Sequence, residues 1–323
     1  MMTVLDFEKP IMELEKKISE LKNLSTSGEL DLDVEVKKLE ARLAHVKKET
    51  YVNLTAWQRV QIARHPKRPY TLDYVQSIFS DFMELHGDRT FADDKALVGG
   101  FAKLDGRSFL VMGHQKGRDA KENIMRNFGS AHPEGYRKAL RFMRLAEKFR
   151  TPIVVFVDTP GAYPGVGAEE RGQAYTIAVN IREMARVKVP ILVYVIGEGG
   201  SGGALGIGVG DRVGVLENAY YSVISPEGCA AILWKDRTKA PEAAAALRLT
   251  AKDLLDMNLI DEVLKEPLGG AHQGPDPMAE VIKLSIQKHL KDVESEDPRY
   301  LIERRYEKFR RMGVCEEKIP SRQ

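Results

Sequence analysis

Two glycine-rich segments constrain the fold of this chain more than any other feature. They read DTPGAYPGVGAEERGQ over residues 158–173 and EGGSGGALGIGVGD over residues 198–211. Each directly follows an apolar run typical of a buried strand, at 153–157 and 191–196, and each leads into a helical pattern. Glycine loses more conformational freedom on folding than any other residue, so dense glycine after a strand requires a physical reason.

A strand, a glycine-rich turn and a helix in succession point unpaired backbone N–H groups in one direction. Such a junction suits a phosphate or a developing oxyanion. The alternative is that the glycines only permit tight turns and close contact between helix and strand. Because two such junctions follow neighbouring strands, we expect a binding or catalytic site where they meet.

Specific chemistries compete for these segments. A phosphate-binding P-loop needs a Gly-Lys pair, which the sequence lacks. The dinucleotide fingerprint needs a glycine three residues after Gly202, where the sequence has Leu205. Ser201 does lie in a Gly-x-Ser-x-Gly pattern, so a serine nucleophile stays open. Its base would be His272, in a later glycine-rich loop, because His289 lies in a charged segment that we expect to be a solvated helix.

The rest of the central region has the pattern of an α/β domain. Apolar runs at 109–112, 153–157 and 191–196 alternate with helical patterns near 134–149 and 169–187. This alternation predicts βαβ units with parallel strands and right-handed crossovers. Further expected elements are a helix at about 71–86 ending at Gly87, a helix start at 225–229, strands at 212–216, 220–224 and 260–264, short helices around 240–256 and a helical tail over 277–312.

The first 65 residues are expected to be helical and separate from the α/β region. Apolar residues recur at spacings of three and four on both sides of a turn-like stretch at 25–28, namely Ile11, Leu14, Ile18, Leu21, Val36, Leu39, Leu43 and Val46. This pattern predicts two antiparallel helices, which either only pack on each other or also grip a partner subunit. We divide the chain into a helical region at 1–94, a core at 95–275 and a helical tail at 276–323.

Composition and charge exclude several classes of protein. The 323 residues are 43% hydrophobic and carry a formal net charge of +2, which gives no reason to expect nucleic acid. No apolar stretch is long enough to span a membrane, and the N-terminus lacks a secretion signal. Cys229 and Cys315 cannot form a disulfide framework or a four-thiolate zinc site, so a cytoplasmic setting is the simplest interpretation. No set of ligand-type side chains has metal-binding spacing, so no metal is expected.

Several charged groups near the strand ends have two open interpretations. Lys116 and Arg118 either meet an anion or are surface charges, and His114 is either a general acid or base or a local hydrogen-bonding group. Glu169 and Glu170 are expected at a helix start, where carboxylates suit the helix dipole. The cations of the helix predicted at 134–149 are interpreted mostly as a solvated face: Arg137, Lys138, Arg141, Arg144 and Lys148.

Seven motifs together resemble one known family. They are ARHPKRPYTLDY (63–74), GDRTFADDKALVGG (87–100), GHQKGRD (113–119), the two glycine-rich segments, SVISPEGCAAILW (222–234) and PLGGAH (267–272). In this order they are similar to the alpha subunits of the carboxyltransferase component of bacterial acetyl-coenzyme A carboxylases. The resemblance covers most of 63–272.

The resemblance implies an α/β fold of the crotonase-like type, a spiral of ββα units. It implies transfer of a carboxyl group from carboxybiotin, held on the biotin carboxyl carrier protein, to acetyl-CoA, which gives malonyl-CoA for fatty-acid synthesis. The implied partners are a beta subunit in an α2β2 heterotetramer and biotin carboxylase. Zinc is implied only in the beta subunit.

The resemblance also assigns site residues. The amides of Gly202 and Gly203 would stabilise negative charge on the ureido oxygen of biotin. Gly161, Ala162, Gly200 and Ser201 would form the carboxybiotin pocket. Two other hypotheses remain: a self-sufficient serine hydrolase of the same fold group using Ser201, and a non-catalytic subunit that only holds a partner.

Overall fold

One sheet of eight strands organises the protein. The computed structural model describes residues 5–26, 32–294 and 297–313, and within them the strand order is β1-β2-β3-β4-β5-β6-β8, with β7 pairing β5. The first three strands are antiparallel, and all pairs from β3 onward are parallel. The strands are β1 Ser80–Glu84, β2 Leu97–Leu104, β3 Arg107–His114, β4 Ile153–Thr159, β5 Ile191–Gly200, β6 Arg212–Leu216, β7 Tyr220–Ser222 and β8 Glu262–Leu264.

The apolar runs and the parallel strands predicted from the sequence are confirmed from β3 to β8. The antiparallel edge was not anticipated. The helix expected at about 71–86 is wrong beyond Ile78, because α4 (Thr71–Ile78) ends there and Ser80–Glu84 forms β1. This edge strand is fixed by pairing with β2, a contact between distant segments that local periodicity does not reveal.

Helices cover both faces of the sheet. Successive residues of a strand point to opposite faces, and Met112 and Gly113 of β3 show this directly. On the face to which Met112 points, its side chain lies beside Gly99 together with α6 (Pro133–Phe149). On the opposite face, Gly113 lies next to Thr71 of α4. The remaining helices are α1 Lys9–Thr26, α2 Asp33–Val52, α3 Ala56–Ala63, α5 Ala120–Met125, α7 Val166–Glu170, α8 Gln173–Met184, α9 Ser201–Leu205, α10 Pro226–Trp234, α11 Ala240–Leu247, α12 Ala251–Asp256, α13 Pro275–Val293 and α14 Pro298–Arg310.

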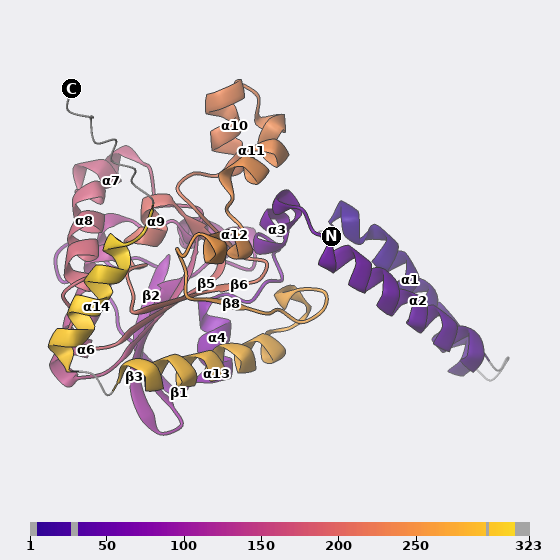
Figure 1. The fold of residues 1–323 in the computed structure, drawn as a ribbon, viewed down its shortest axis with the longest axis horizontal. Helices are drawn as coiled ribbons and strands as arrows, with labels where there is room; N and C mark the ends of the chain where they lie inside the picture. Colours follow the sequence, from indigo (N-terminus) through magenta and orange to yellow (C-terminus); the bar gives the residue numbers. More distant parts are fainter. Residues whose placement is uncertain (1–4, 27–31, 295–296, 314–323) are drawn as a thin grey trace, which may run out of the picture.

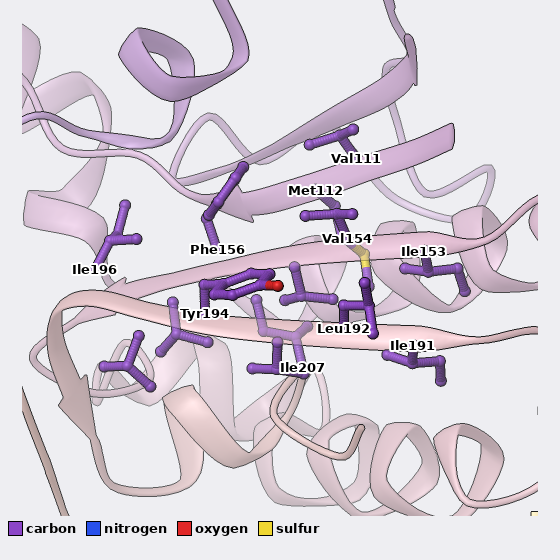
Figure 2. Close-up of a cluster of buried hydrophobic side chains, with 14 of the residues drawn as sticks. Val111, Met112, Ile153, Val154, Phe156, Ile191, Leu192, Tyr194, Ile196 and Ile207 are labelled. Carbon is purple, nitrogen blue, oxygen red and sulfur yellow. The ribbon is translucent and has the colours of Figure 1, made fainter. Parts of the chain in front are cut away.

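The central strands carry the main hydrophobic core. Every residue of β4 and of β5 is buried, as expected for parallel strands covered on both faces. Figure 2 shows the resulting cluster, in which side chains from β3, β4 and β5 pack together with Ile207. This rigid layer ends at Thr159 and Gly200, where the two glycine-rich turns begin.

The N-terminal helical hairpin predicted from the sequence is confirmed. Helices α1 and α2 lie side by side and project away from the sheet (Figure 1). Ion pairs Lys22–Glu40 and Lys47–Glu15, each with an N–O distance of 2.6 Å, run between them in antiparallel register. Of the predicted turn at 25–28, Ser25 and Thr26 belong to α1, and the last two residues lie outside the described part of the chain.

Two expectations about the helices flanking the sheet are corrected. The single helix predicted at 169–187 is split into α7 and α8 by Gly172, whose φ is +81°. Of the α6 cations, Arg144 and Lys148 are exposed as expected, but Arg137 and Lys138 do not belong to a solvated face. Lys138 is buried, with its Nζ atom 2.5 Å from Asp93 Oδ1, and Arg137 Nε lies 2.7 Å from Asp88 Oδ2. Their partners lie in a loop between β1 and β2, so the pairing depends on the tertiary fold.

The other predicted elements are confirmed with shifted ends. They are the short strands and helices between 212 and 264, the helix beginning after Ser225, and the helical tail, which α13 and α14 form. Among the described residues, none of the helices is both long enough and apolar enough to cross a membrane.

Candidate active site

The two glycine-rich turns meet backbone to backbone. They follow β4 and β5, which are parallel neighbours with Thr159 opposite Gly199. An ideal Cβ atom on Gly200 would overlap the Pro160 carbonyl and lie 2.8 Å from the Thr159 carbonyl oxygen. Real Cβ atoms do not approach this closely, so Gly200 is required by the contact between the turns.

Gly203 makes a second contact of the same kind. An ideal Cβ atom there would overlap the Ala162 amide nitrogen and lie 2.5 Å from the carbonyl carbon of Gly161. Gly202, by contrast, faces open space, because the nearest atom to its ideal Cβ is Ile177 Cδ1 at 3.7 Å. The six residues that the sequence singled out are therefore brought together, but Gly203 faces the first turn rather than the pocket.

Two backbone N–H groups at this junction lack acceptors. Gly202 and Gly203 lie in the first turn of α9, where amides have no carbonyl four residues upstream in the helix. Neither amide donates a hydrogen bond to any described group. Helix α9 is held in place by the Tyr136 hydroxyl, which donates to the Gly203 carbonyl at 3.2 Å, and by the Asn180 amide, which donates to the Gly206 carbonyl at 3.0 Å. Fixed, unpaired amides of this kind can stabilise an oxyanion.

A pocket of about 420 Å³ opens where the turns meet. Gly161, Ala162, Ser201 and Gly202 line it, while Gly200 and Gly203 lie behind this lining. The remaining lining residues are Pro160, Tyr163, Pro164, Glu169, Gln173, Ala174, Ile177, Val223, Ile224 and Ser225. The predicted helix-start position of Glu169 is confirmed, because it lies in the first turn of the short helix α7, and it also lines this pocket.

Buried charges lie beneath the turns. Lys116 Nζ is 2.7 Å from Asp158 Oδ1 and 2.8 Å from Glu198 Oε1. Arg64 Nε lies 2.7 Å from Glu198 Oε2, and the Tyr220 hydroxyl donates to the same oxygen at 2.6 Å. Burial alone would raise the pKa of Glu198, but Lys116 and Arg64 lower it to about 2. Lys116 is therefore an internal cation and not a surface charge, and the anions that it meets are the carboxylates of Asp158 and Glu198.

Asp158 and Glu198 are the first residues of the two glycine-rich segments, but the sequence predicts no role for them. The signal that marks them is local: each is an acidic residue at the end of an otherwise apolar, buried strand, directly before a glycine-rich turn. A buried carboxylate requires a partner. The sequence does not identify that partner, because Lys116 and Arg64 are far along the sequence from Asp158 and Glu198.

Comparisons with known proteins show the family to which this chain belongs. The model of a family described as acetyl co-enzyme A carboxylase carboxyltransferase-like matches residues 4–313. A relative from Geobacter metallireducens, called acetyl-coenzyme A carboxylase carboxyl transferase subunit alpha, is 58% identical over 309 residues, which cover 96% of this chain and 97% of the relative. The Thermus thermophilus protein of the same name is 58% identical over 313 residues, 97% of this chain and 99% of the relative. The chain belongs to this carboxyltransferase family.

Solved structures confirm the crotonase-like fold expected for the carboxyltransferase family. A transcarboxylase 12S structure matches with a TM-score of 0.58 and 19% identity, covering 80% of this chain and 46% of that chain. A Pseudomonas malonate decarboxylase hetero-tetramer in complex with coenzyme A matches with a TM-score of 0.56 and 15% identity, covering 73% of this chain and 91% of that chain. The chain spans about half the length of the transcarboxylase 12S chain.

Arg118, whose role the sequence left open, is structural, whereas the interpretation of His114 as a local hydrogen-bonding group is wrong, because neither ring nitrogen has a hydrogen-bond partner among the described residues. His114 is fully buried at the end of β3, and burial lowers the pKa of its imidazole to about 3. A ring that is neutral throughout the physiological range does not act as a general acid there. Arg118 donates to the carbonyls of Pro66 and Arg68 at 2.9 Å each and lies over the Tyr70 ring.

The serine hydrolase alternative lacks a base. Ser201 has φ +49°, a strained turn like that of a nucleophile elbow, but its side chain makes no hydrogen bond with the described residues. His272 Nε2 lies 3.2 Å from Glu8 Oε1 instead. His289, predicted to be solvated, is buried, with its Nε2 atom 2.9 Å from Glu262 Oε2. Both histidines are engaged away from Ser201, so the carboxyltransferase assignment is favoured.

One cluster of ligand-type side chains does exist, although sequence spacing gave no sign of it. Atoms of Glu8, His65 and His272 lie within 4.8 Å of one another, and all three residues are buried. Their contacts are hydrogen bonds: the Tyr51 hydroxyl donates to Glu8, and the Lys67 amide donates to His65 Nδ1 at 3.2 Å. The cluster fastens the N-terminal segment and α2 onto the loop around His272.

Proposed function

We propose that this chain is the alpha subunit of the carboxyltransferase component of acetyl-CoA carboxylase. It would form, with a beta subunit, the enzyme that transfers the carboxyl group of carboxybiotin to acetyl-CoA and so produces malonyl-CoA for fatty-acid synthesis. Family membership over 4–313 and identity of 58% to relatives with that name support this reaction.

One observation carries the assignment of the site. Two unpaired amides, those of Gly202 and Gly203, are held rigidly where the two glycine-rich turns meet, beside a pocket of about 420 Å³. A bound oxyanion at this place would find donors that need no rearrangement. The arrangement fits the ureido oxygen of biotin, and the volume suits a small ring system.

Carboxybiotin, when bound, supplies the carboxyl group and leaves a basic ureido oxygen that can accept the proton of the acetyl methyl group. The amides of Gly202 and Gly203 would donate hydrogen bonds to that oxygen. The backbone of Gly161 and Ala162 forms the facing wall and holds α9 at its present distance. Of the side chains that line the pocket, only Tyr163 and Glu169 are titratable, which fits a reaction in which this chain supplies donors rather than a base.

The partners belong to the proposal as well. We infer an α2β2 heterotetramer, in which the beta subunit binds acetyl-CoA and holds zinc, with the biotin carboxyl carrier protein and biotin carboxylase supplying carboxybiotin. The division of the chain into a helical region at 1–94, a core at 95–275 and a tail at 276–323 assigns the active site to the core. A cytoplasmic location fits the low cysteine content of two residues.

The test is an assay of the reverse reaction with purified proteins. The chain is produced alone and together with its beta subunit, and decarboxylation of malonyl-CoA is followed with free biotin as the acceptor. We expect no turnover by the chain alone and biotin-dependent turnover by the complex. A complex that forms but shows no biotin-dependent turnover would contradict the proposal.

A further inference from the structure

The buried cation beneath the two turns has no role in the chemistry proposed above. Lys116 follows β3, and its side chain is 11% exposed, while the side chains of Asp158 and Glu198 are 2% and 7% exposed. Burying a charged group is costly unless a partner compensates it. Three buried charges at the base of a site built from backbone atoms therefore call for a functional explanation.

We propose that Lys116 is a positioning residue: its ammonium group ties the end of β4 to the end of β5 and so sets the contact between the two glycine-rich turns. This inference rests on the proposed function for its catalytic consequence. Lys116 itself does not touch the pocket, and it acts through Asp158 and Glu198, the residues from which the turns begin.

The two carboxylates depend on Lys116 to different degrees. Glu198 keeps Arg64 and Tyr220 as partners if Lys116 is removed. Among the described residues, Asp158 accepts hydrogen bonds from Lys116 at 2.7 Å and from the backbone amide of Glu198 at 2.9 Å. Burial raises the pKa of Asp158 even with Lys116 in place, so loss of the cation would leave a buried carboxyl that takes up a proton and is no longer tied to Glu198 through the ammonium group.

The strands leave little room for the Asp158 carboxyl to rearrange in place. An ideal Cβ atom on Gly197 would lie 2.5 Å from Asp158 Oδ1, so the carboxylate is pressed against the backbone of β5. The backbone around Lys116 is also fixed, because the Gly117 amide donates to Asn123 Oδ1 at 3.0 Å. Loss of the tie would therefore move the turns that follow the two strands, which carry Gly161 and Gly203.

The first experiment replaces the cation with a neutral side chain of similar length. Lys116→Met is assayed in the complex with the beta subunit, and kcat and KM for malonyl-CoA are measured. Because a shift of about 1 Å in a site can lower the rate about 10²-fold, we expect kcat to fall by about that factor while KM stays within about twofold. Lys121→Met, at an exposed lysine of α5 without an ion pair, is the matched control and should match the wild type.

A second variant separates positioning from a general loss of stability. Lys116→Met combined with Asp158→Asn replaces the buried carboxyl along with the cation, so it should fold and recover kcat to within about 10-fold of the wild type, because removing both partners of a buried pair can be nearly neutral. If kcat of the single variant falls only in proportion to lost folded protein, and the double variant gives no recovery, Lys116 is structural and the inference is overturned.

Hydrogen exchange decides the inference independently of catalysis. In Lys116→Met, amides in peptides spanning 157–165 and 197–206 should exchange faster, and the rest of β4 and β5 should not. Wild-type exchange at these peptides together with wild-type kcat would overturn the positioning role. If the wild-type complex itself has no biotin-dependent activity, the proposed function fails. The exchange measurement still decides whether Lys116 holds the two glycine-rich turns in position.

Discussion

The position that a Gly203 side chain would occupy is already filled by the backbone of Ala162. An ideal Cβ atom there would overlap the Ala162 amide nitrogen. The contact lies between the loop after β4 and the helix after β5, so it fixes the distance between the two turns. Any side chain at residue 203 must push them apart.

Gly203→Ala should therefore lower activity sharply without blocking the pocket. The added methyl group displaces the Gly203 amide from the wall that Gly161 and Ala162 form. Loss of one oxyanion donor lowers kcat about 10²–10³-fold, and we expect a decrease in this range. The measurement is biotin-dependent decarboxylation of malonyl-CoA by the complex.

Gly202→Ala is the matched comparison, one residue away. Its Cβ atom meets only Ile177 Cδ1 at 3.7 Å, which is ordinary van der Waals contact, and the backbone amide is kept. We expect a loss of less than about 10-fold. Equal losses in the two variants would contradict the idea that contact between the turns positions the donors.

Removal of one partner of a buried ion pair should strongly destabilise the core. Arg68 and Glu266 have side chains 1% and 0% exposed, and Arg68 Nε also donates to the Ile196 carbonyl at 2.6 Å. Arg68→Met leaves Glu266 as a buried carboxylate without a cation, so the free energy of unfolding should fall by about 3–5 kcal/mol in urea titrations. Lys265→Met, which breaks an exposed pair with Glu217, should change it by less than about 1 kcal/mol. Similar decreases in the free energy of unfolding in the two variants would contradict this prediction.

The parts of the site that sequence analysis predicted share one property: their signal is local. Gly161 and Gly203 stand directly after apolar strands, so their place at the strand ends followed from neighbouring residues. The partners of Glu198 did not, because Arg64 and Lys116 reach it from elements that no pattern links to β5.

The errors have the same origin. Lys138 was interpreted as solvated because helical periodicity does not reveal that Asp93 lies against it. Residues 80–84 were assigned to a helix because their pairing with β2 is a long-range contact. In each case tertiary contacts outweighed a correct local pattern.

Acid should weaken the attachment of α13 to the sheet. Glu262 of β8 accepts hydrogen bonds from His289, Ser285 and Lys288 of α13. The hydrogen bond from His289, with the other two, outweighs burial and lowers the pKa of Glu262 from 4.5 to about 2. Because the folded pKa is depressed, this stabilisation is present above pH 4.5 and is lost as the pH falls toward 2.

Glu262→Gln therefore tests this linkage. The difference in free energy of unfolding between wild type and variant should be largest above about pH 5 and should shrink as the pH is lowered toward 2 in urea titrations. Glu303→Gln changes an exposed carboxylate of α14 and serves as the control. A wild-type-to-variant difference that stays constant with pH would argue against the linkage.

A second buried arginine fastens the C-terminal helix. Arg305 of α14 is 0% exposed, pairs with Asp211 at 2.7 Å and donates to the carbonyls of Met184, Val187 and Val189. In Arg305→Met we expect faster hydrogen exchange across α14 and a loss of about 3–5 kcal/mol in stability. Arg311→Met, at a site 80% exposed, should leave both quantities near wild type. An undisturbed α14 in the first variant would show that other contacts hold this helix.

Ser201→Ala separates backbone from side-chain catalysis at the same bend. If the amides of Gly202 and Gly203 provide the stabilisation, removing the Ser201 hydroxyl should lower biotin-dependent turnover by less than about 10-fold, because its side chain makes no hydrogen bond with the described residues. A serine nucleophile would instead lose about 10⁶-fold.

A fluorophosphonate probe gives a second readout: Ser201 should remain unlabelled, because His272 and His289 bind Glu8 and Glu262 and leave it without a base. Labelling that disappears in Ser201→Ala, together with a collapse of activity, would replace the carboxyltransferase mechanism with a hydrolytic one.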